Sequence, residues 1–409
     1  GCAVRLLLIG WMIISSRVLP SYDLQTYLLS KSESVSPMLA PFASWDGVFF
    51  LSLAIDGYVH EHQHAFFPLY PLLIRALTGL GEMVGLSDTN SYIFAGVVIS
   101  FVAFVVSLLT LYYITKALFG SSFAMKTGIV FCFAPASVFF TSVYTESIYG
   151  CFSLLACYFL LTKDNVLASC IFFALASFTR SNGLINMGFV LYYFVNKVVP
   201  FSTFPKLKGL SFSVIVNTVL LSIANLLPFV LYVSYSTNPY CDLIPTPPYC
   251  LNTKFPNIYS YIQSRYWNQG FLKYWQIREI PNFLLCAPAA IISLIVGTIY
   301  MKNYIARHPL FNRNSTNMQA QPQKPLMLNN DVLVYVVHLL VLVVFGIFCM
   351  HTQVITRFIS ACPAFYWGVI WLTEQKRLGL LRYVPMLYAV FYTFFGGMMF
   401  ASFYPWRSE

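Results

Sequence analysis

The sequence predicts an all-α polytopic membrane protein in which about 11 transmembrane helices form a single domain over residues 1–409. Hydrophobic residues make up 58% of the chain and charged residues only 9%, with a mean hydropathy of +0.69. A soluble domain contains about 25% charged residues. Apolar runs approaching the ~20 residues needed to cross a bilayer recur along the whole chain. In such a chain the net charge of +10 indicates membrane topology, not nucleic-acid binding.

The apolar runs are separated by short polar turns. The opening run lacks a small-residue cleavage site followed by a soluble domain, so we expect it to be a first span, not a signal peptide. The expected spans are 4–20, 92–115, 124–141, 147–162, 165–179, 183–199, 210–235, 283–301, 332–350, 358–373 and 383–403.

Basic residues cluster in the turns that the positive-inside rule assigns to the cytosol. They are Lys116, Lys126, Lys163, Lys197, Lys206, Lys208, Lys302, Arg307, Arg313, Lys324, Lys376, Arg377 and Arg382. The alternation requires 66–83, which contains two prolines and Arg75, to be a helix lying in the interface. The non-cytosolic loops are then about 21–90 and 236–282, and the loop of about 302–331 is cytosolic. Asn314, a formal glycosylation acceptor in "NST", is predicted to stay unmodified.

The non-cytosolic face also collects polar groups. Asp46 follows Trp45, and a carboxylate held beside aromatic residues at a membrane surface suits general-base catalysis. The alternative role for Asp46 is the N-cap of a helix at 47–55, for which Asp is a favoured residue.

The segment "HEHQH" places His60, His62 and His64 at every second position. In an extended segment the three imidazoles would share one side and could bind Zn²⁺. A hydrated interfacial loop is the alternative. Since no fourth ligand is evident, we expect no metal at this site.

Three further segments on this face carry charge or hydrogen-bonding capacity. Glu146 begins a span, where it suits the helix dipole or a functional role. Arg180 and Asn182 lie in a hairpin; an arginine fork matches phosphate oxygens, although a lone interfacial arginine can simply snorkel. His351 and Arg357, between two spans, would offer a phosphate-bearing lipid a proton donor and a guanidinium fork.

The segment 258–283 mixes aromatic rings with polar side chains. This mixture suits sugar stacking and hydroxyl recognition, and an aromatic belt at the membrane interface is the alternative. Its candidate substrate-binding residues are Gln263, Arg265, Trp267, Asn268 and Lys273.

Two cysteines differ from the others, which lie mostly in apolar runs. Cys241 and Cys250 flank the polar, Pro-rich "DLIPTPPY". We favour a disulfide between them over two free thiols, and a disulfide requires an oxidising compartment.

Several of these segments together resemble the PIG-V family of GPI mannosyltransferases. The resemblance runs from about residue 4 to the closing "FYPW" and differs in loop lengths and in the extra His60 and His64. Its motifs are "SWDGVFFLSLAIDGYVHEHQHAFFPLYPLL", "VYTES", "RSNGL", "IYSYIQSRYWNQGFLKYW", "IPNFLLCAPAAI" and "CMHTQVITRF".

The resemblance implies a GT-C-type glycosyltransferase of the endoplasmic reticulum membrane with a luminal active site. It implies transfer of the second, α-1,6-linked mannose from dolichyl-phosphate-mannose to the mannosylated GPI precursor, by inversion and without a cofactor. Asp46 then matches the catalytic acidic residue of the first luminal loop and would act as the base. Arg180, His351 and Arg357 become candidates for binding the donor phosphate. A different lipid-linked or protein acceptor, a lipid transporter or scramblase, and a small membrane partner subunit stay open.

Overall fold

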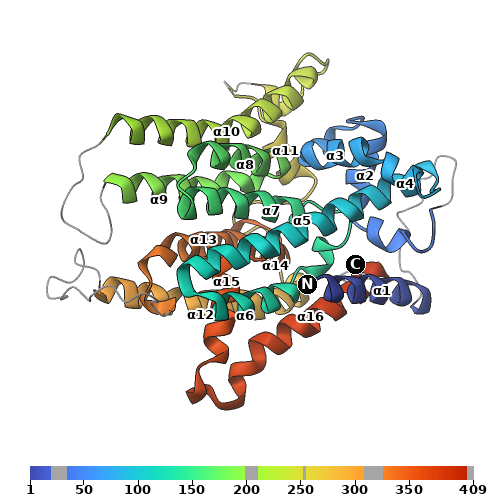
Figure 1. The fold of residues 1–409 in the computed structure, drawn as a ribbon. Coiled ribbons are helices and arrows are strands. Elements are labelled where there is room, and N and C mark those ends of the chain that lie inside the picture. The colour runs from blue at the N-terminus through green and yellow to red at the C-terminus, as the bar shows by residue number, and fades with distance from the viewer. Residues whose placement is uncertain (20–34, 199–210, 252–254, 308–325, 403–409) are drawn as a thin grey trace.

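The computed structural model describes residues 1–19, 35–198, 211–251, 255–307 and 326–402. Within these ranges the regular structure is helical and there is no strand, so the predicted all-α class is confirmed. Figure 1 shows the α-helices: α1 (Cys2–Val18), α2 (Gly47–Asp56), α3 (Leu69–Leu77), α4 (Gly79–Glu82), α5 (Asp88–Phe119), α6 (Ser121–Cys132), α7 (Glu146–Cys157), α8 (Val166–Thr179), α9 (Met187–Val198), α10 (Phe212–Cys241), α11 (Ile258–Arg265), α12 (Ile280–Arg307), α13 (Leu333–Cys349), α14 (Val354–Ile359), α15 (Pro363–Thr373) and α16 (Val384–Ala401).

The helices follow the apolar runs, but they differ in length. Five helical segments of the described chain are long and apolar enough to cross a membrane: Asp88–Phe119, Phe212–Cys241, Ile277–Arg307, Asn330–Cys349 and Lys376–Ala401. The predicted span 124–141 is interrupted, because Pro135 disfavours helical geometry at the residue before it and α6 ends at Cys132. A 3₁₀ turn, η4 (Ser137–Phe140), follows the break. The number of membrane crossings therefore stays a prediction.

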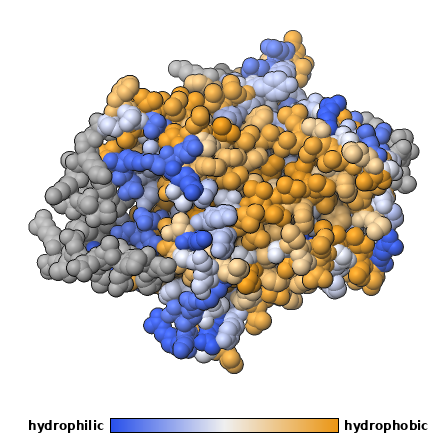
Figure 2. All heavy atoms as spheres, in the orientation of Figure 1, coloured by the Kyte–Doolittle hydropathy of each residue, from blue (hydrophilic) through white to orange (hydrophobic). Residues whose placement is uncertain are grey.

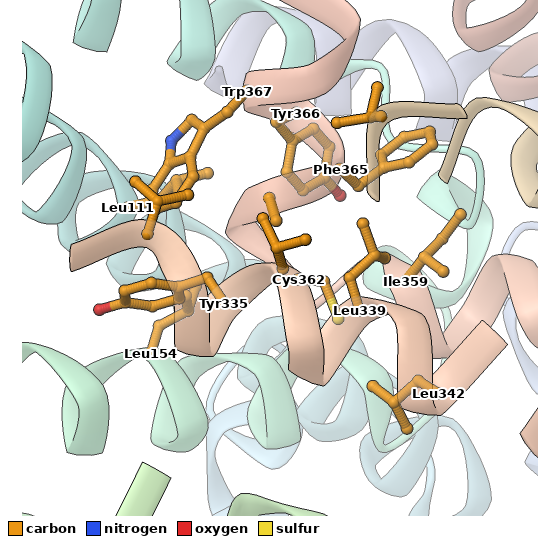
Figure 3. Packing of buried hydrophobic residues seen from close by; sticks show 14 of the residues in the cluster. Leu111, Leu154, Tyr335, Leu339, Leu342, Ile359, Cys362, Phe365, Tyr366 and Trp367 are labelled. Carbon is orange, nitrogen blue, oxygen red and sulfur yellow. The ribbon is translucent and has the colours of Figure 1, made fainter. Parts of the chain in front are cut away.

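The largest apolar core lies among α5, α7, α13 and α15 (Figure 3). Trp367 of α15 is completely buried, and its Nε1 donates a hydrogen bond of 2.9 Å to Thr115 Oγ1 of α5. Tyr335 packs edge-on against the Trp367 ring at 5.2 Å. On α15 a Cβ at Gly368 would lie 2.7 Å from a methyl group of Val296, so only glycine allows α12 and α15 to approach this closely.

The bundle has two different ends. At one end, which we call the cavity end, lie α2, α3 and α4; at the opposite, basic end lie the C-terminal ends of α9 and α12 (Figure 1). Figure 2 shows hydrophobic residues over most of the visible face, with hydrophilic residues gathered toward its margins.

Contacts between predicted cytosolic turns hold the basic end together. Lys126 pairs with Glu374 at 2.6 Å, and Lys197 pairs with Asp164 at 2.7 Å. The guanidinium of Arg307 donates to two backbone carbonyl groups of the 326–328 turn. The turns that the positive-inside rule assigns to one side of the membrane thus meet at one end of the molecule.

A buried arginine joins α1 to the break after α6. Arg5 is completely buried, and its Nη1 donates to Ser137 O at 2.8 Å. Its Nη2 reaches Cys132 O at 3.4 Å, and its guanidinium lies 4.0 Å from the centre of the Phe104 ring. The carbonyl groups that the helix break releases therefore solvate this charge.

The segment predicted to lie in the interface forms α3 and α4. α3 has nine residues. At 1.5 Å per residue it is about 14 Å long, too short to cross a hydrocarbon core of about 30 Å. The predictions that concern Asn314, Arg313, Lys324, Lys206 and Lys208 fall outside the described residues.

Candidate active site

A cavity of about 420 Å³ opens at the cavity end of the bundle. Its walls come from segments that are far apart in sequence: the first loop, the starts of α7 and η6 (Ser181–Asn186), α11, the turn before α14, and α16. Of the predicted site residues, those that line it are Trp45, Asp46, Arg180, Asn182, Gln263, Trp267, His351 and Arg357.

Four predicted residues do not line the cavity. Arg265, Asn268 and Lys273 are exposed outside it, and Lys273 Nζ donates to Ser264 Oγ at 2.9 Å. On α11 only one side faces the cavity, so Tyr259 and Gln263, four residues apart, line it instead. Glu146 is only 2% exposed and lies behind the wall.

Glu146 and two arginines form a buried charge cluster. Arg180 Nη1 and Arg357 Nε both donate to the same oxygen, Glu146 Oε1. Arg357 also reaches forward to the cavity, where its Nη1 lies 3.2 Å from Asp46 Oδ2. Glu146 thus holds both guanidinium groups in place from behind the wall, and it does not itself line the cavity, where the sequence placed it as a substrate-binding candidate.

Asp46 occupies the N-cap position of α2, but its side chain makes no cap hydrogen bond. The carboxylate is about one third exposed (33%) and faces Arg357. Its backbone N–H donates to Tyr144 Oη at 2.9 Å. The preceding Trp45 has φ +57°, a left-handed conformation that is rare for a bulky residue. The local chain therefore directs the Asp46 carboxylate to the cavity instead of to the helix end.

Aromatic rings hold the Arg357 guanidinium from another side. Its centre lies 4.8 Å from the Phe139 ring centroid and 5.2 Å from that of Tyr144. Such contacts favour a cation where water is partly excluded. Among the described residues, Arg357 Nη2 makes no hydrogen bond, so part of the fork is available to an anion.

A glycine allows the turn that begins at Arg180 to pack closely on α8. A Cβ at Gly183 would lie 2.5 Å from Ser177 Cα, so a larger residue would push η6 away from α8. Arg180 is the C-cap of α8 and begins this turn. The close packing fixes where its guanidinium enters the charge cluster.

His351 lies at another part of the cavity. Its Nε2 is 2.6 Å from Trp267 O, and since a carbonyl only accepts, this nitrogen carries the proton and donates. The imidazole stacks on Tyr274 with ring centroids 4.5 Å apart. The Nε2 proton is thus directed to the protein backbone and not to a phosphate.

The "HEHQH" segment forms the start of a 3₁₀ turn, η3 (Glu61–Ala65), with His60 as its N-cap, and not the extended segment that would place the three imidazoles on one side. Gln63 caps the turn, and His64 stacks on Tyr58 at 4.5 Å. Burial lowers the pKa of His64 to about 4, which keeps its ring neutral at physiological pH. Within the described residues no group of three His, Cys, Asp or Glu could hold a metal ion.

The same turn connects the first loop to the loop after α10. Glu61 accepts hydrogen bonds of 2.8 Å from the hydroxyl groups of Tyr249 and Tyr266. Tyr249 lies next to Cys250, which forms a disulfide with Cys241; their Cα atoms are 5.5 Å apart. The polar cluster of 60–64 therefore positions α11 over the cavity.

Some lining residues were not named individually as site candidates: Tyr144, Tyr259, Tyr274, Asn282 and Gln353. Asn282 lies in the first turn of a long apolar helix, and an amide at the start of a span was the available signal. Tyr274 is one of the aromatic rings of the segment 258–283, and that mixture was its signal. Gln353 gave none, because its hydrogen bond of 2.7 Å with Tyr274 joins segments far apart in sequence.

Comparison with known proteins agrees with a transferase site. Residues 27–407 match the family described as Mannosyltransferase (PIG-V). The chain is 32% identical over 390 residues to GPI alpha-1,6-mannosyltransferase 2 of Homo sapiens, covering 86% of this chain and 77% of the relative. It is 26% identical over 455 residues to GPI mannosyltransferase 2 of Drosophila melanogaster, covering 99% of this chain and 98% of the relative.

Among solved structures, ArnT from Cupriavidus metallidurans in the apo state aligns with a TM-score of 0.49 and 12% identity, covering 98% of this chain and 76% of that one. The family match spans nearly the whole sequence, including every segment that lines the cavity. This multi-pass membrane protein therefore belongs to the PIG-V family of mannosyltransferases.

Proposed function

We propose that the protein transfers the second, α-1,6-linked mannose from dolichyl-phosphate-mannose to the mannosylated GPI precursor in the lumen of the endoplasmic reticulum. The names of the relatives supply the acceptor class and the linkage. The observation that carries the chemistry is the pairing at the cavity wall, where the Asp46 carboxylate lies 3.2 Å from Arg357.

The donor is a β-linked mannosyl phosphate and the product linkage is α, so a single displacement inverts the anomeric carbon. Asp46 takes the proton of the attacking acceptor hydroxyl group, whose oxygen forms the bond to C1 of mannose. The bond from C1 to the phosphate oxygen breaks, and its electron pair leaves with dolichyl phosphate. Arg180 and Arg357 stabilise the negative charge that develops there.

The charge cluster supports this division of roles. Glu146 keeps both guanidinium groups at the wall but is itself 2% exposed, which leaves Asp46 as the carboxylate that an acceptor can reach. A phosphate bound to Arg357 competes with Asp46 for the same cation and would release the carboxylate for proton transfer. His351 contributes by holding Trp267 and stacking on Tyr274. No cofactor enters the proposed step.

The test is an assay of purified protein with dolichyl-phosphate-mannose and monomannosylated glucosaminyl-phosphatidylinositol. An α-1,6-linked dimannosyl product that Asp46→Asn fails to form supports the proposal. Product only with another lipid-linked or protein acceptor would replace the substrate assignment. Movement of lipid between leaflets without product would indicate a transporter.

The luminal orientation has a separate test. The disulfide of the 236–282 loop supports an oxidising compartment for the cavity end. A sequon engineered into the 241–256 loop, far enough from the membrane to be reached, should be glycosylated in cells, and Asn314 should stay unmodified. A glycosidase-sensitive mass shift that disappears in Asn314→Gln would reverse the orientation.

A further inference from the structure

The cavity contains an amide group with a defined direction. Asn282, in the first turn of α12, is 1% exposed and lines the cavity. Its Nδ2 donates to Tyr274 Oη at 2.7 Å and to Glu279 Oε2 at 2.9 Å. Both hydrogens of the amide nitrogen are therefore used by the protein.

The orientation of this amide follows from its partners. A carboxylate only accepts hydrogen bonds, and Arg278 Nε lies 3.5 Å from the other carboxylate oxygen, Glu279 Oε1. The nitrogen of Asn282 must therefore face Glu279. Tyr274 gives its own hydroxyl proton to Gln353 Oε1 at 2.7 Å, so its oxygen is left to accept from Asn282. These contacts exclude the alternative orientation of the Asn282 amide, in which the oxygen and the nitrogen exchange places. Without such contacts the two orientations are hard to distinguish.

With the nitrogen fixed, Asn282 Oδ1 has to face the other way. This oxygen is buried, and no donor within the described residues reaches it. A buried carbonyl oxygen without a donor is unfavourable, and such atoms normally have a partner. Since Asn282 lines the cavity, a molecule bound there can provide that donor.

We propose that Asn282 Oδ1 accepts a hydrogen bond from a hydroxyl group of a sugar bound in the cavity, and that Glu279 and Tyr274 are positioning residues that hold the amide in this direction. The inference rests on the proposed function, and the sugar is either the mannosyl group of the donor or the glycan of the acceptor. A pre-oriented acceptor makes Asn282 a specificity-determining residue, because a sugar lacking that hydroxyl group leaves the oxygen unpaired.

The experiment pairs enzyme variants with substrates that lack one hydroxyl group. Purified full-length protein is assayed with dolichyl-phosphate-mannose, with its 2-, 3-, 4- and 6-deoxymannosyl analogues, and with acceptors lacking single hydroxyl groups. The wild type should lose roughly 10- to 100-fold in kcat/KM with one analogue, because that analogue leaves one buried polar atom unpaired. Asn282→Ala should lose a similar factor with the native pair and lose nothing further with that analogue.

The donor analogues and the acceptor analogues together show which substrate carries the hydroxyl group that Asn282 binds. Selectivity lost for a donor analogue places the hydroxyl group on the transferred mannose, and selectivity lost for an acceptor analogue places it on the glycan. If Asn282→Ala slows the native pair and every analogue by the same factor, the proposed hydrogen bond does not exist. If the wild type forms no product from the native pair, the proposed function itself fails and takes this inference with it.

Two further variants test whether misfolding, instead of loss of the hydrogen bond, explains the effect of Asn282→Ala. Glu279→Gln keeps the size of the side chain but can donate as well as accept, which lets the Asn282 amide flip. It should reduce selectivity against the same analogue with protein abundance unchanged, and full selectivity in Glu279→Gln would contradict the positioning role. Asn303→Ala, at the other end of the same helix, is the matched control and should leave both rate and selectivity unchanged.

Discussion

The two ends of the bundle use the same kinds of charged residues differently. At the basic end Lys126 and Glu374 pair with side chains 53% and 45% exposed. At the cavity end Arg180 and Glu146 pair with side chains 17% and 2% exposed. Exposed pairs contribute about 0–1 kcal/mol to stability, whereas removing one partner of a buried pair costs roughly 3–5 kcal/mol.

The sharing of charges differs as well. At the basic end Lys126 and Lys197 each pair with a different carboxylate, and both partners of each pair are exposed to water. At the cavity end two guanidinium groups share one oxygen of Glu146, and Arg357 extends to Asp46. The first arrangement lies in turns that the sequence predicts to be cytosolic. The second holds two cations at the wall of the cavity, where the proposed function places the donor phosphate, so changes at the two ends should have very different effects.

The largest expected effect is on catalysis at the cavity end. Asp46→Asn keeps the size of the side chain but removes the base, and transfer should fall by about 10²- to 10⁴-fold. Because Asp46 makes no cap hydrogen bond, protein abundance should be normal. Rates of mannose transfer with the purified variant measure this. Wild-type rates would remove Asp46 from the mechanism, and loss of folded protein would restore the cap role.

Glu146→Gln and Glu374→Gln are the direct comparison between the ends. The first removes the carboxylate that two buried cations share and should lower the free energy of unfolding by roughly 3–5 kcal/mol, with loss of transfer. The second breaks an exposed pair and should cost under about 1 kcal/mol with normal transfer. Thermal unfolding in detergent measures both. Equal destabilisation by the two variants would show that burial does not distinguish the ends.

Arg357→Lys keeps the charge but removes the fork. An ammonium group cannot present Nε to Glu146 and Nη1 to Asp46 in one plane. We expect kcat to fall by roughly 10- to 100-fold with a smaller loss of stability than in Glu146→Gln. Steady-state kinetics of the variant, with Lys126→Arg as the control at the other end, provides the measurement. An unchanged kcat would mean that charge alone is sufficient.

Among the changes at the cavity end, the smallest effect on kcat is expected from the disulfide. Cys241 and Cys250 are nine residues apart, so their bridge restrains only a short loop. Replacing both by Ser should cost roughly 2–3 kcal/mol and raise KM through the position of α11, with kcat little changed. In the wild type the two thiols should resist alkylation in unfolded protein until a reductant is added. Free alkylation before reduction would exclude the bridge.

The helices could be predicted from the sequence, because each is specified by an apolar run and by the charges that flank it, both of which are close together in the chain. The break at Pro135 was missed because one proline competes with a long apolar run, and the contacts that decide the outcome come from Arg5, far away in sequence. The conformation around 60–65 was left open, because alternating histidines fit both an extended segment and a hydrated loop. The structure has a 3₁₀ turn there, in which His64 stacks on Tyr58.

The candidate site was predictable in part. Topology alone grouped Asp46, Arg180, His351 and Arg357 on one face, and all four line the cavity. The role of Glu146 was not predictable, because it depends on segments 34 and 211 residues away arriving at one oxygen atom. The direction of the Asn282 amide likewise depends on side chains, which no residue pattern specifies.

The buried guanidinium of Arg5 has a consequence for how the protein is made. Its nearest acceptor, Ser137 O, lies 132 residues further along the chain. At roughly 5–20 residues per second, α1 waits about 7–26 s after synthesis before that carbonyl group exists. The sequence predicts α1 to be a membrane span, and an arginine costs about 2.5–3.5 kcal/mol on insertion at the centre of such a helix and less near its end, where Arg5 lies. α1 therefore docks only after the break following α6 has emerged, and a nascent chain stopped before that point leaves its first helix without a stable place in the bundle.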